Sequence, residues 1–319
     1  MQIVTFLKRW SLPCSIVLGA VIYLLFAYIP LLQPVGDAVG PWLEELIPFV
    51  LFGLLYVTFC KIQIHDMRPR AWHFWLQSIR VALSGLLVWL ISLATGADTK
   101  LVLEGVFICV ICPTASAAPV VTERLGGSIA SLTVYTIIAN VVTSVIIPLF
   151  FPMVEKSADI SFLSASLMVL RNVTSVLVAP LVLALVSRKV VPRFTDRIRA
   201  MDNLGFYMWC FNLTIITGLT MRNILRSSVS GGVLLLLLVL PLFVSLFQFA
   251  VGKWVGRFYG DSISAGQALG QKNTVVGIWL TFTFLNPLAA VAPGAYVLWQ
   301  NMINAWQLWC KDKYGRLRW

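Results

Sequence analysis

Long apolar runs separated by short polar connectors fill almost the whole chain of 319 residues. A membrane-spanning helix needs about 20 mostly apolar residues, because roughly 30 Å of hydrocarbon is crossed at about 1.5 Å per residue. Windows of this kind predict ten spans: Leu12–Leu32, Glu45–Cys60, Leu76–Ala94, Leu101–Val121, Ile129–Phe151, Phe162–Val186, Leu204–Ile224, Val233–Trp254, Ile263–Phe284 and Pro287–Leu308. The pattern predicts an all-α integral membrane protein with one membrane domain over residues 1–319.

Composition agrees with the pattern. Hydrophobic residues make up 59% of the chain and charged residues 12%, about half the roughly 25% charge of a soluble domain. Soluble enzymes, nucleic-acid-binding proteins and disordered chains are therefore not among the leading classes. The sequence shows no nucleophile–base pair, phosphate loop or cofactor motif, so we expect no enzymatic activity, cofactor or nucleic-acid partner. The expected partners are the lipid bilayer and a small molecule, and the oligomeric state is open.

The basic residues predict the orientation. With the N-terminus in the cytoplasm, the inner connectors hold most of the 24 lysines and arginines, Arg80 among them. The outer connectors hold only Lys100, Lys156, Arg222 and Arg226. This bias is typical of cytoplasmic loops, and an even number of spans returns the chain to the same side. We therefore expect a multi-pass protein of the plasma (inner) membrane with both termini in the cytoplasm.

Two predicted spans contain helix-breaking residues at matching positions. Ten spans divide into halves of five, about 10–153 and 160–310, and an odd count inserts the second half with inverted topology, as in many secondary transporters. The fourth span contains Pro113 and Pro119, and the ninth contains Gly270 before a polar run. Proline removes a backbone donor and glycine weakens a helix, so both spans are expected to unwind near mid-membrane. Ordinary kinked helices in a bundle are the alternative.

The same segments carry a family resemblance. Cys112-Pro113, Pro119, Gly126-Gly127 and Pro148, then Gly270-Gln271-Lys272-Asn273 and Trp299-Gln300-Asn301, resemble the bile acid:sodium symporter family across essentially the whole chain. The resemblance implies a core domain of helices 3–5 and 8–10, in which the broken helices 4 and 9 cross. It also implies a panel domain of helices 1, 2, 6 and 7 that rocks against the core.

The sequence departs from the resemblance where that family binds sodium. The family's Ser-Asn step aligns with Ala118 and Pro119, and its glutamate aligns with Ala268, beside Gln267. Lys272 stands where the family usually has glutamine, and hard cations require several oxygen ligands. We therefore hypothesise that Lys272 takes the place of the sodium ion, neutralised by a substrate anion, by backbone carbonyls or by loss of its proton. Snorkelling of Lys272 to an interface is the alternative.

The remaining candidate site residues follow from position and resemblance. We expect substrate binding by Thr114, Ser116, Pro119, Arg171, Gln271, Lys272, Asn273 and Thr274. The resemblance places a cation site near Ala118, Thr136, Asn140, Gln267, Ala268 and Lys272. Arg171 inside the sixth span marks a site by default, with a structural pairing as the alternative. Packing between helices is the alternative for Thr136 and Asn140, and we expect no bound metal.

Together with the resemblance, which implies a bile-acid-like class of substrate and alternating access, these patterns predict a secondary transporter that moves a small amphipathic organic anion, bile-acid-like or a carboxylate, without sodium. Three alternatives remain: a sodium-coupled symporter with an unusual site, an arsenite-type exporter that uses Cys109 and Cys112, and a membrane receptor of the same fold that does not transport.

Overall fold

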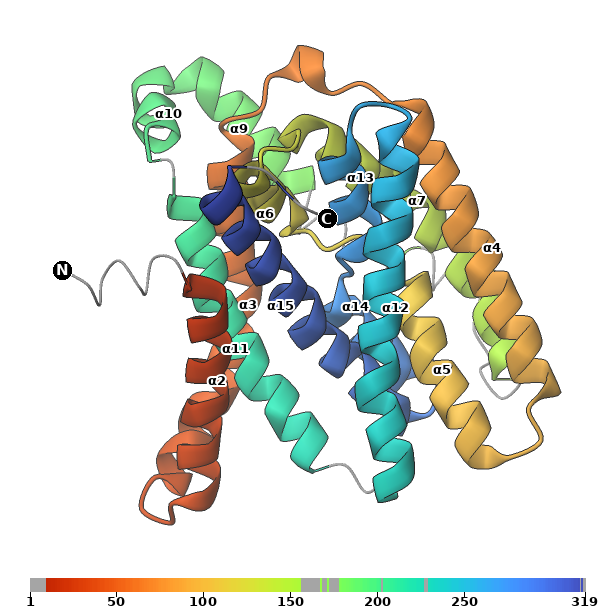
Figure 1. Cartoon of the computed structure of the whole chain (residues 1–319). Helices are drawn as coiled ribbons and strands as arrows, with labels where there is room; N and C mark the ends of the chain where they lie inside the picture. Colours follow the sequence, from red (N-terminus) through yellow and green to blue (C-terminus); the bar gives the residue numbers. More distant parts are fainter. Residues whose placement is uncertain are drawn as a thin grey trace.

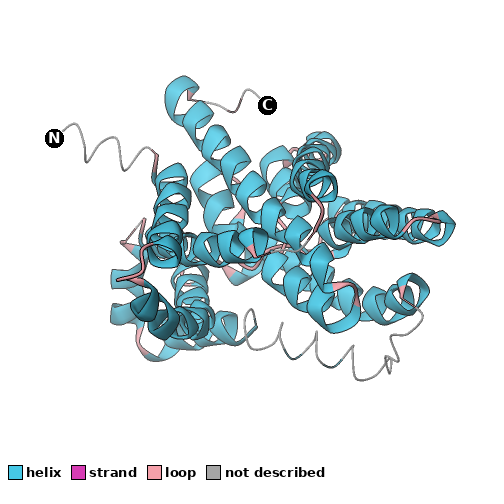
Figure 2. Ribbon diagram, turned by 90° about the horizontal axis from the view of Figure 1, so that it is seen from below, coloured by secondary structure: helices cyan, strands magenta, loops and turns pink. Residues whose placement is uncertain are grey.

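The computed structural model describes residues 10–155, 167, 171, 178–201, 203–226, 229–315 and 317. Within these ranges all regular structure is helical apart from one isolated backbone bridge, and Figure 2 shows the helices packed closely together. The prediction of an all-α fold is confirmed.

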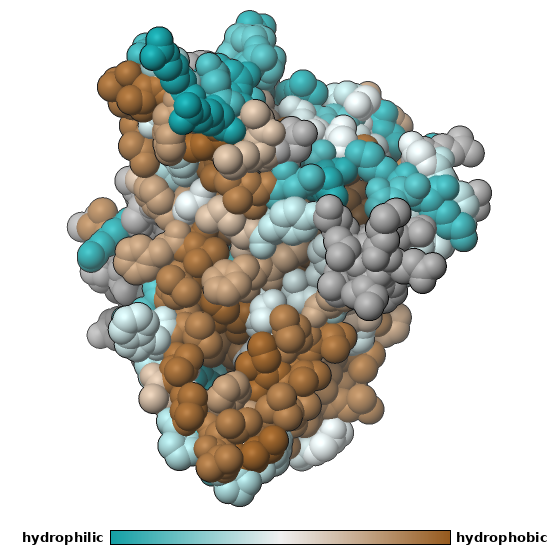
Figure 3. Space-filling model, turned by 90° about the vertical axis from the view of Figure 1, so that its left-hand side faces the viewer, coloured by the Kyte–Doolittle hydropathy of each residue, from teal (hydrophilic) through white to brown (hydrophobic). Residues whose placement is uncertain are grey.

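Among the residues that the structure describes, six helices are long and apolar enough to cross a membrane. They are α2 (Ser11–Tyr28), α3 (Gln33–Phe59), α4 (Ala71–Leu93), α7 (Ile129–Val154), α11 (Leu204–Leu225) and α12 (Gly231–Arg257). Large apolar side chains such as Phe49, Trp89 and Phe243 are exposed on them. Figure 3 shows an extensive hydrophobic surface below a hydrophilic end, and soluble monomers rarely expose such patches. The chain is therefore a multi-pass membrane protein.

Two predicted spans are each divided into two shorter helices. The first consists of α5 (Ala97–Ile111) and α6 (Ala118–Leu125), and the second of α13 (Ser262–Gly270) and α14 (Thr274–Phe284). Pro113 has no N–H with which to continue α5. The Asn273 side chain starts α14 by accepting from the Val276 N–H at 3.3 Å, as an N-cap residue does. Both predicted interruptions are present.

Five further elements complete the described chain: η1 (Ile64–Asp66), α9 (Ala179–Val190), α10 (Pro192–Arg199), η3 (Pro287–Ala290) and α15 (Val291–Tyr314). The predicted last span, Pro287–Leu308, corresponds to η3 and most of α15. The predicted sixth span, Phe162–Val186, lies mostly outside the described residues.

Two sequence-based expectations were wrong. The second span was predicted to start at Glu45, but α3 begins at Gln33. Pro34 lies in its first turn, where the missing N–H removes no helical hydrogen bond, and the helix continues through Pro41. Arg80 was assigned to an inner connector, but it lies inside α4 and is buried.

The helices pack in two groups (Figure 1). In one group α11 packs against α2 and α3, and α3 also contacts α9. In the other, α12 packs against α13, α15 and α5, while α4 contacts α5 and α7. Close approach of α2 and α11 requires a glycine, because a Cβ at Gly19 would lie 2.3 Å from the Thr214 carbonyl oxygen. Contacts of α11 with α6 and α15 join the two groups.

Candidate functional site: the meeting point of the interrupted helices

The two interrupted segments meet backbone to backbone, and we call residues 112–117 and 271–273 the crossover. Thr114 and Lys272 form an antiparallel bridge. The Ala115 N–H donates to the Gln271 carbonyl at 3.0 Å. Unwound backbone is tolerated at membrane depth only where protein or a water-filled cavity satisfies it. Here each segment satisfies part of the other.

The last carbonyls of α5 lose their helical partners at the break. A helix carbonyl normally accepts from the N–H four residues later, but Pro113 has none to offer Cys109. Three side chains donate instead: Gln248 Nε2 to the Cys109 oxygen at 3.2 Å, Lys272 Nζ to the Val110 oxygen at 3.0 Å, and Arg80 Nη1 to the Ile111 oxygen at 2.9 Å. Cations are favourable at a helix C-terminus, and two of these three donors are cations.

Both cations are buried deep inside the protein. Lys272 and Arg80 are each 1% exposed. Among the described residues, neither forms an ion pair with a carboxylate. A buried charge is stable only when it is paired or hydrogen-bonded, and backbone carbonyls fulfil that requirement here. Their charges are therefore not cancelled by any neighbouring acidic side chain in the described structure.

Arg80 was missed as a site residue, although a signal was present. It joins α4 to α7 by donating from Nη1 to Thr143 Oγ1 at 2.7 Å and from Nη2 to the Ala139 oxygen at 3.0 Å. Its Nε donates to Gln77 Oε1 at 3.0 Å. An arginine inside a predicted span, Leu76–Ala94 here, marks a functional site by default. The orientation count concealed that signal by assigning Arg80 to a connector.

A neutral chain of hydrogen bonds joins the ends of α5 and α13. Gln248 Nε2, already bonded to Cys109, also donates to the Tyr296 hydroxyl at 3.0 Å. That hydroxyl donates to the Gly270 carbonyl, at the end of α13, at 2.8 Å. The two helix ends are thus held by α12 and α15 as well as by each other.

The polar α7 residues expected at a cation site are bonded within their own helix. Thr136 Oγ1 donates to the Leu132 oxygen at 2.8 Å, and Asn140 Nδ2 donates to the Thr136 oxygen at 2.7 Å. Ala118, at the start of α6, supplies no side-chain oxygen. A cation-binding role for this group remains a prediction.

Three glutamines form a chain of hydrogen bonds: Gln271 of the crossover, Gln267 of α13 and Gln307 of α15. Gln271 Nε2 donates to Gln267 Oε1, and Gln267 Nε2 donates to Gln307 Oε1 at 3.3 Å. The Ala268 carbonyl accepts from Thr114 Oγ1 at 2.7 Å. These hydrogen bonds therefore stabilise the crossover.

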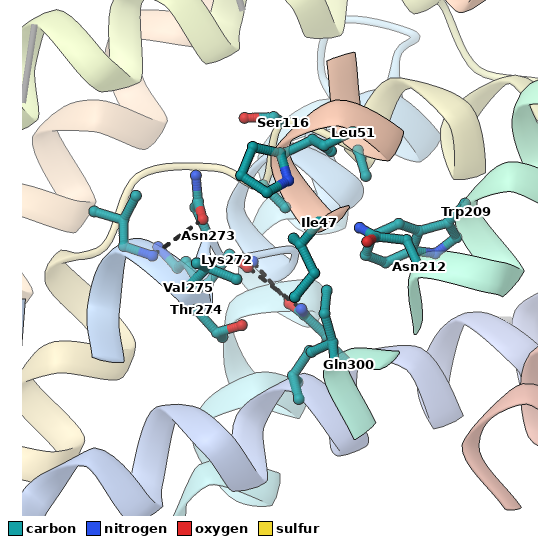
Figure 4. Close-up of a pocket in the computed structure, with 16 residues that line it drawn as sticks. Ile47, Leu51, Ser116, Trp209, Asn212, Lys272, Asn273, Thr274, Val275 and Gln300 are labelled. Carbon is teal, nitrogen blue, oxygen red and sulfur yellow. Dashed lines mark hydrogen bonds between the residues drawn. The ribbon is translucent and has the colours of Figure 1, made fainter. Parts of the chain in front are cut away.

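A cavity of about 120 Å³ lies between the crossover and the other helix group. It is lined by Ile47, Pro48, Leu51, Ala115, Ser116, Ala117, Trp209, Asn212, Ile216, Lys272, Asn273, Thr274, Val275, Val276, Val297 and Gln300. Figure 4 shows Asn212 and Trp209 of α11 facing Lys272, Asn273 and Gln300. The cavity is smaller than the roughly 300–1,000 Å³ typical of drug-sized ligands. In this conformation it fits a small ligand, and a larger one requires the two helix groups to separate.

The predicted substrate-binding residues divide by location. Ser116, Asn273 and Thr274 line the cavity together with Lys272. Lys272 presents its backbone there, since its N–H donates to Gln300 Oε1 at 2.8 Å while its ammonium binds Val110.

The other predicted substrate residues do not line this cavity. Thr114, Pro119 and Gln271 are buried behind it, and Arg171 is exposed. Their roles in substrate binding remain predictions.

The two cysteines offered for arsenite binding are also absent from the lining. Cys109 and Cys112 are both buried. The described residues contain no cluster of three or more metal-ligating side chains. No specific observation favours the arsenite reading.

Comparison with known proteins agrees with the resemblance found in the sequence. The model of the SBF-like CPA transporter family matches residues 16–304. No curated protein matches the sequence.

Proposed function

Because the chain belongs to the SBF-like CPA transporter family, we propose that it is a secondary transporter that carries a small amphipathic organic anion and does not use sodium. Membership of this family indicates that the chain is a membrane transporter. The anion, the absence of sodium coupling and the mechanism are our own inferences from the crossover and the cavity.

The helix packing supports transport by alternating access. The group of α2, α3, α9 and α11 is the panel, and the group of α4, α5, α7 and α12–α15 is the core. We take residues about 10–153 and 160–310 as two inverted repeats, each with one interrupted helix. The cavity lies between panel and core, so rocking of one against the other exposes it alternately to the two sides, as repeats do in other transporters.

The charge of the crossover supports an anionic substrate, and this single observation carries the proposal. Two helix C-termini, of α5 and α13, and two N-termini, of α6 and α14, meet there. Each end contributes about half an elementary charge, negative or positive, so the four contributions cancel. The two buried cations, Arg80 and Lys272, then leave a net charge of about +2 at the crossover, part of which lines the cavity. An anion entering the cavity is attracted, and a sodium ion is repelled.

The same two cations explain why sodium is unnecessary. They donate to the carbonyls that the break in α5 leaves free, and a mobile cation in their place would bind those oxygens. Ala118, Pro119 and Ala268 supply none of the side-chain oxygens that the resemblance implies for a sodium site. We infer that fixed side-chain charges replaced the ion, with the protein in the inner membrane and both termini in the cytoplasm.

The test begins with purified protein in detergent and a panel of small carboxylates and sulfates. A compound that binds the folded protein raises its melting temperature. Any compound that does so is then followed into proteoliposomes, with sodium outside or replaced by N-methylglucamine at the same membrane potential. We expect equal initial rates in the two media.

Each other outcome has a distinct meaning. A steep dependence on sodium refutes the sodium-independent mechanism. Binding of an anion without uptake supports a receptor of the same fold. A panel in which only cations or neutral compounds bind refutes the anion.

A further inference from the structure

One wall of the cavity holds polar atoms that nothing in the described structure satisfies. Trp209 and Asn212 lie three residues apart on α11, on the same face of the helix, and both line the cavity. Asn212 is 1% exposed. Neither its Nδ2 nor its Oδ1 has a hydrogen-bond partner among the described residues, and Trp209 Nε1 has none either. Figure 4 shows both side chains facing the crossover.

Some polar groups close to this wall do have partners. Gln300 uses both ends of its amide on the Lys272 backbone, at 2.8 and 3.3 Å. On α11 itself, Thr214 and Thr217 donate to carbonyls one turn earlier. Buried polar groups without partners destabilise a folded protein, so their presence calls for an explanation. An unsatisfied asparagine and tryptophan facing a cavity indicate a missing ligand group.

The count of donors and acceptors identifies that group. The wall offers one acceptor, Asn212 Oδ1, and two donating nitrogens, Asn212 Nδ2 and Trp209 Nε1. A hydroxyl supplies one donor and two acceptor lone pairs, which complements this set. We propose that Trp209 and Asn212 form a second polar subsite that binds a hydroxyl group of the transported anion. This inference rests on the proposed function and narrows its substrate class to hydroxylated organic anions.

The surface between the two polar ends fits the rest of such a molecule. Ile47, Leu51, Ile216 and Val297 line the cavity between α11 and the crossover. The crossover attracts the anionic group, the apolar side chains contact the hydrocarbon body, and Asn212 with Trp209 binds the hydroxyl. An ordered water has similar hydrogen-bonding capacity and is the competing occupant.

The experiment uses matched pairs of straight-chain carboxylates with four to ten carbons, each with and without a terminal hydroxyl. Binding to the full-length protein in detergent is measured by calorimetry for wild type, Asn212→Leu and a control, Thr217→Val. The control also replaces a buried polar side chain of α11 with an apolar one, but Thr217 does not line the cavity. Melting temperatures are measured without ligand for all three proteins.

We expect the hydroxylated member of at least one pair to bind wild type and Thr217→Val about tenfold more tightly than its partner. In Asn212→Leu that ratio falls to about one, while the non-hydroxylated acid binds as well as to wild type. Because the leucine removes unpaired polar atoms, the ligand-free Asn212→Leu protein melts at a higher temperature than wild type. A purely structural asparagine would give the opposite shift.

Three outcomes overturn the proposal. If pairs bind but no pair prefers the hydroxyl, a water fills the subsite, and the proposed anion function still stands. If the preference survives in Asn212→Leu, the hydroxyl binds elsewhere. If no carboxylate binds any of the three proteins, the subsite fails, and the organic-anion function fails with it only if the panel of carboxylates and sulfates also contains no binder.

Discussion

Replacing Lys272 with methionine tests the central feature of the site. Methionine keeps a similar length and flexibility but removes the ammonium, which donates to the Val110 oxygen at 3.0 Å. That carbonyl then lies buried with one partner fewer. A buried polar group left unsatisfied costs about 1–3 kcal/mol, and relief from burying a charge offsets part of it. We therefore expect a net loss of about 1–2 kcal/mol of stability.

Melting in detergent measures this loss directly. Five of the six cysteines are buried, so a thiol-reactive fluorophore reports unfolding as they become accessible. Roughly 2 °C accompanies each kcal/mol in a chain of this size, so the melting temperature falls by about 2–4 °C. The matched control is Lys189→Met, which removes the same charge from an exposed position and should change stability by no more than about 0.5 kcal/mol.

The same variant tests the electrostatic argument. At an effective dielectric constant of 20, two unit charges 4 Å apart interact by about 4 kcal/mol, and the energy is half that at twice the distance. Loss of the ammonium should therefore weaken binding of an anion about tenfold or more. The argument is wrong if Lys272→Met melts and binds anions as Lys189→Met does, because Lys272 then neither satisfies Val110 nor attracts the substrate.

Two further predictions concern the framework of the site. Gln248→Leu should lower the free energy of unfolding by about 1–3 kcal/mol. The loss should be smaller in a Pro113→Ala background, because residue 113 then has an N–H that can donate to the Cys109 carbonyl. Equal losses in both backgrounds, measured by thermal melting, would contradict this coupling. Gly252→Ala should destabilise the protein by about 1–3 kcal/mol, since its Cβ would lie 2.4 Å from a backbone oxygen of α13. Gly232→Ala is the control, because its Cβ would enter open space. Similar melting temperatures for the two variants would show that α12 and α13 separate freely.

Much of the architecture was accessible from the sequence because it depends on local rules. Apolar runs of membrane-spanning length predicted the helical class. Pro113 and Gly270 predicted the two interruptions, since proline and glycine act on their own helix whatever surrounds them. The apolar window placed the start of α3 too late, at Glu45, although the helix begins at Gln33 and continues through Pro41.

The partners of the freed carbonyls required the tertiary structure. Gln248, Lys272 and Arg80 come from α12, the crossover and α4, and their donation to three consecutive carbonyls of α5 depends on how those elements cross. No spacing in the sequence relates these positions. Lys272 was a candidate because it stands where the resembled family usually has glutamine, but its direction toward Val110, away from the cavity, was decided by packing.

The polar residues of α11 also show the difference between what the sequence predicts and what the tertiary structure determines. The sequence alone does not separate Asn212 from Thr217, because both are polar residues in one apolar helix. The fold turns Asn212 toward the cavity, while the Thr217 hydroxyl bonds its own helix. Composition and breakers thus determined a membrane bundle with two unwound helices, since those are properties of single segments. Which polar groups remain available to bind a ligand was determined only by the packing of segments that are distant in the chain.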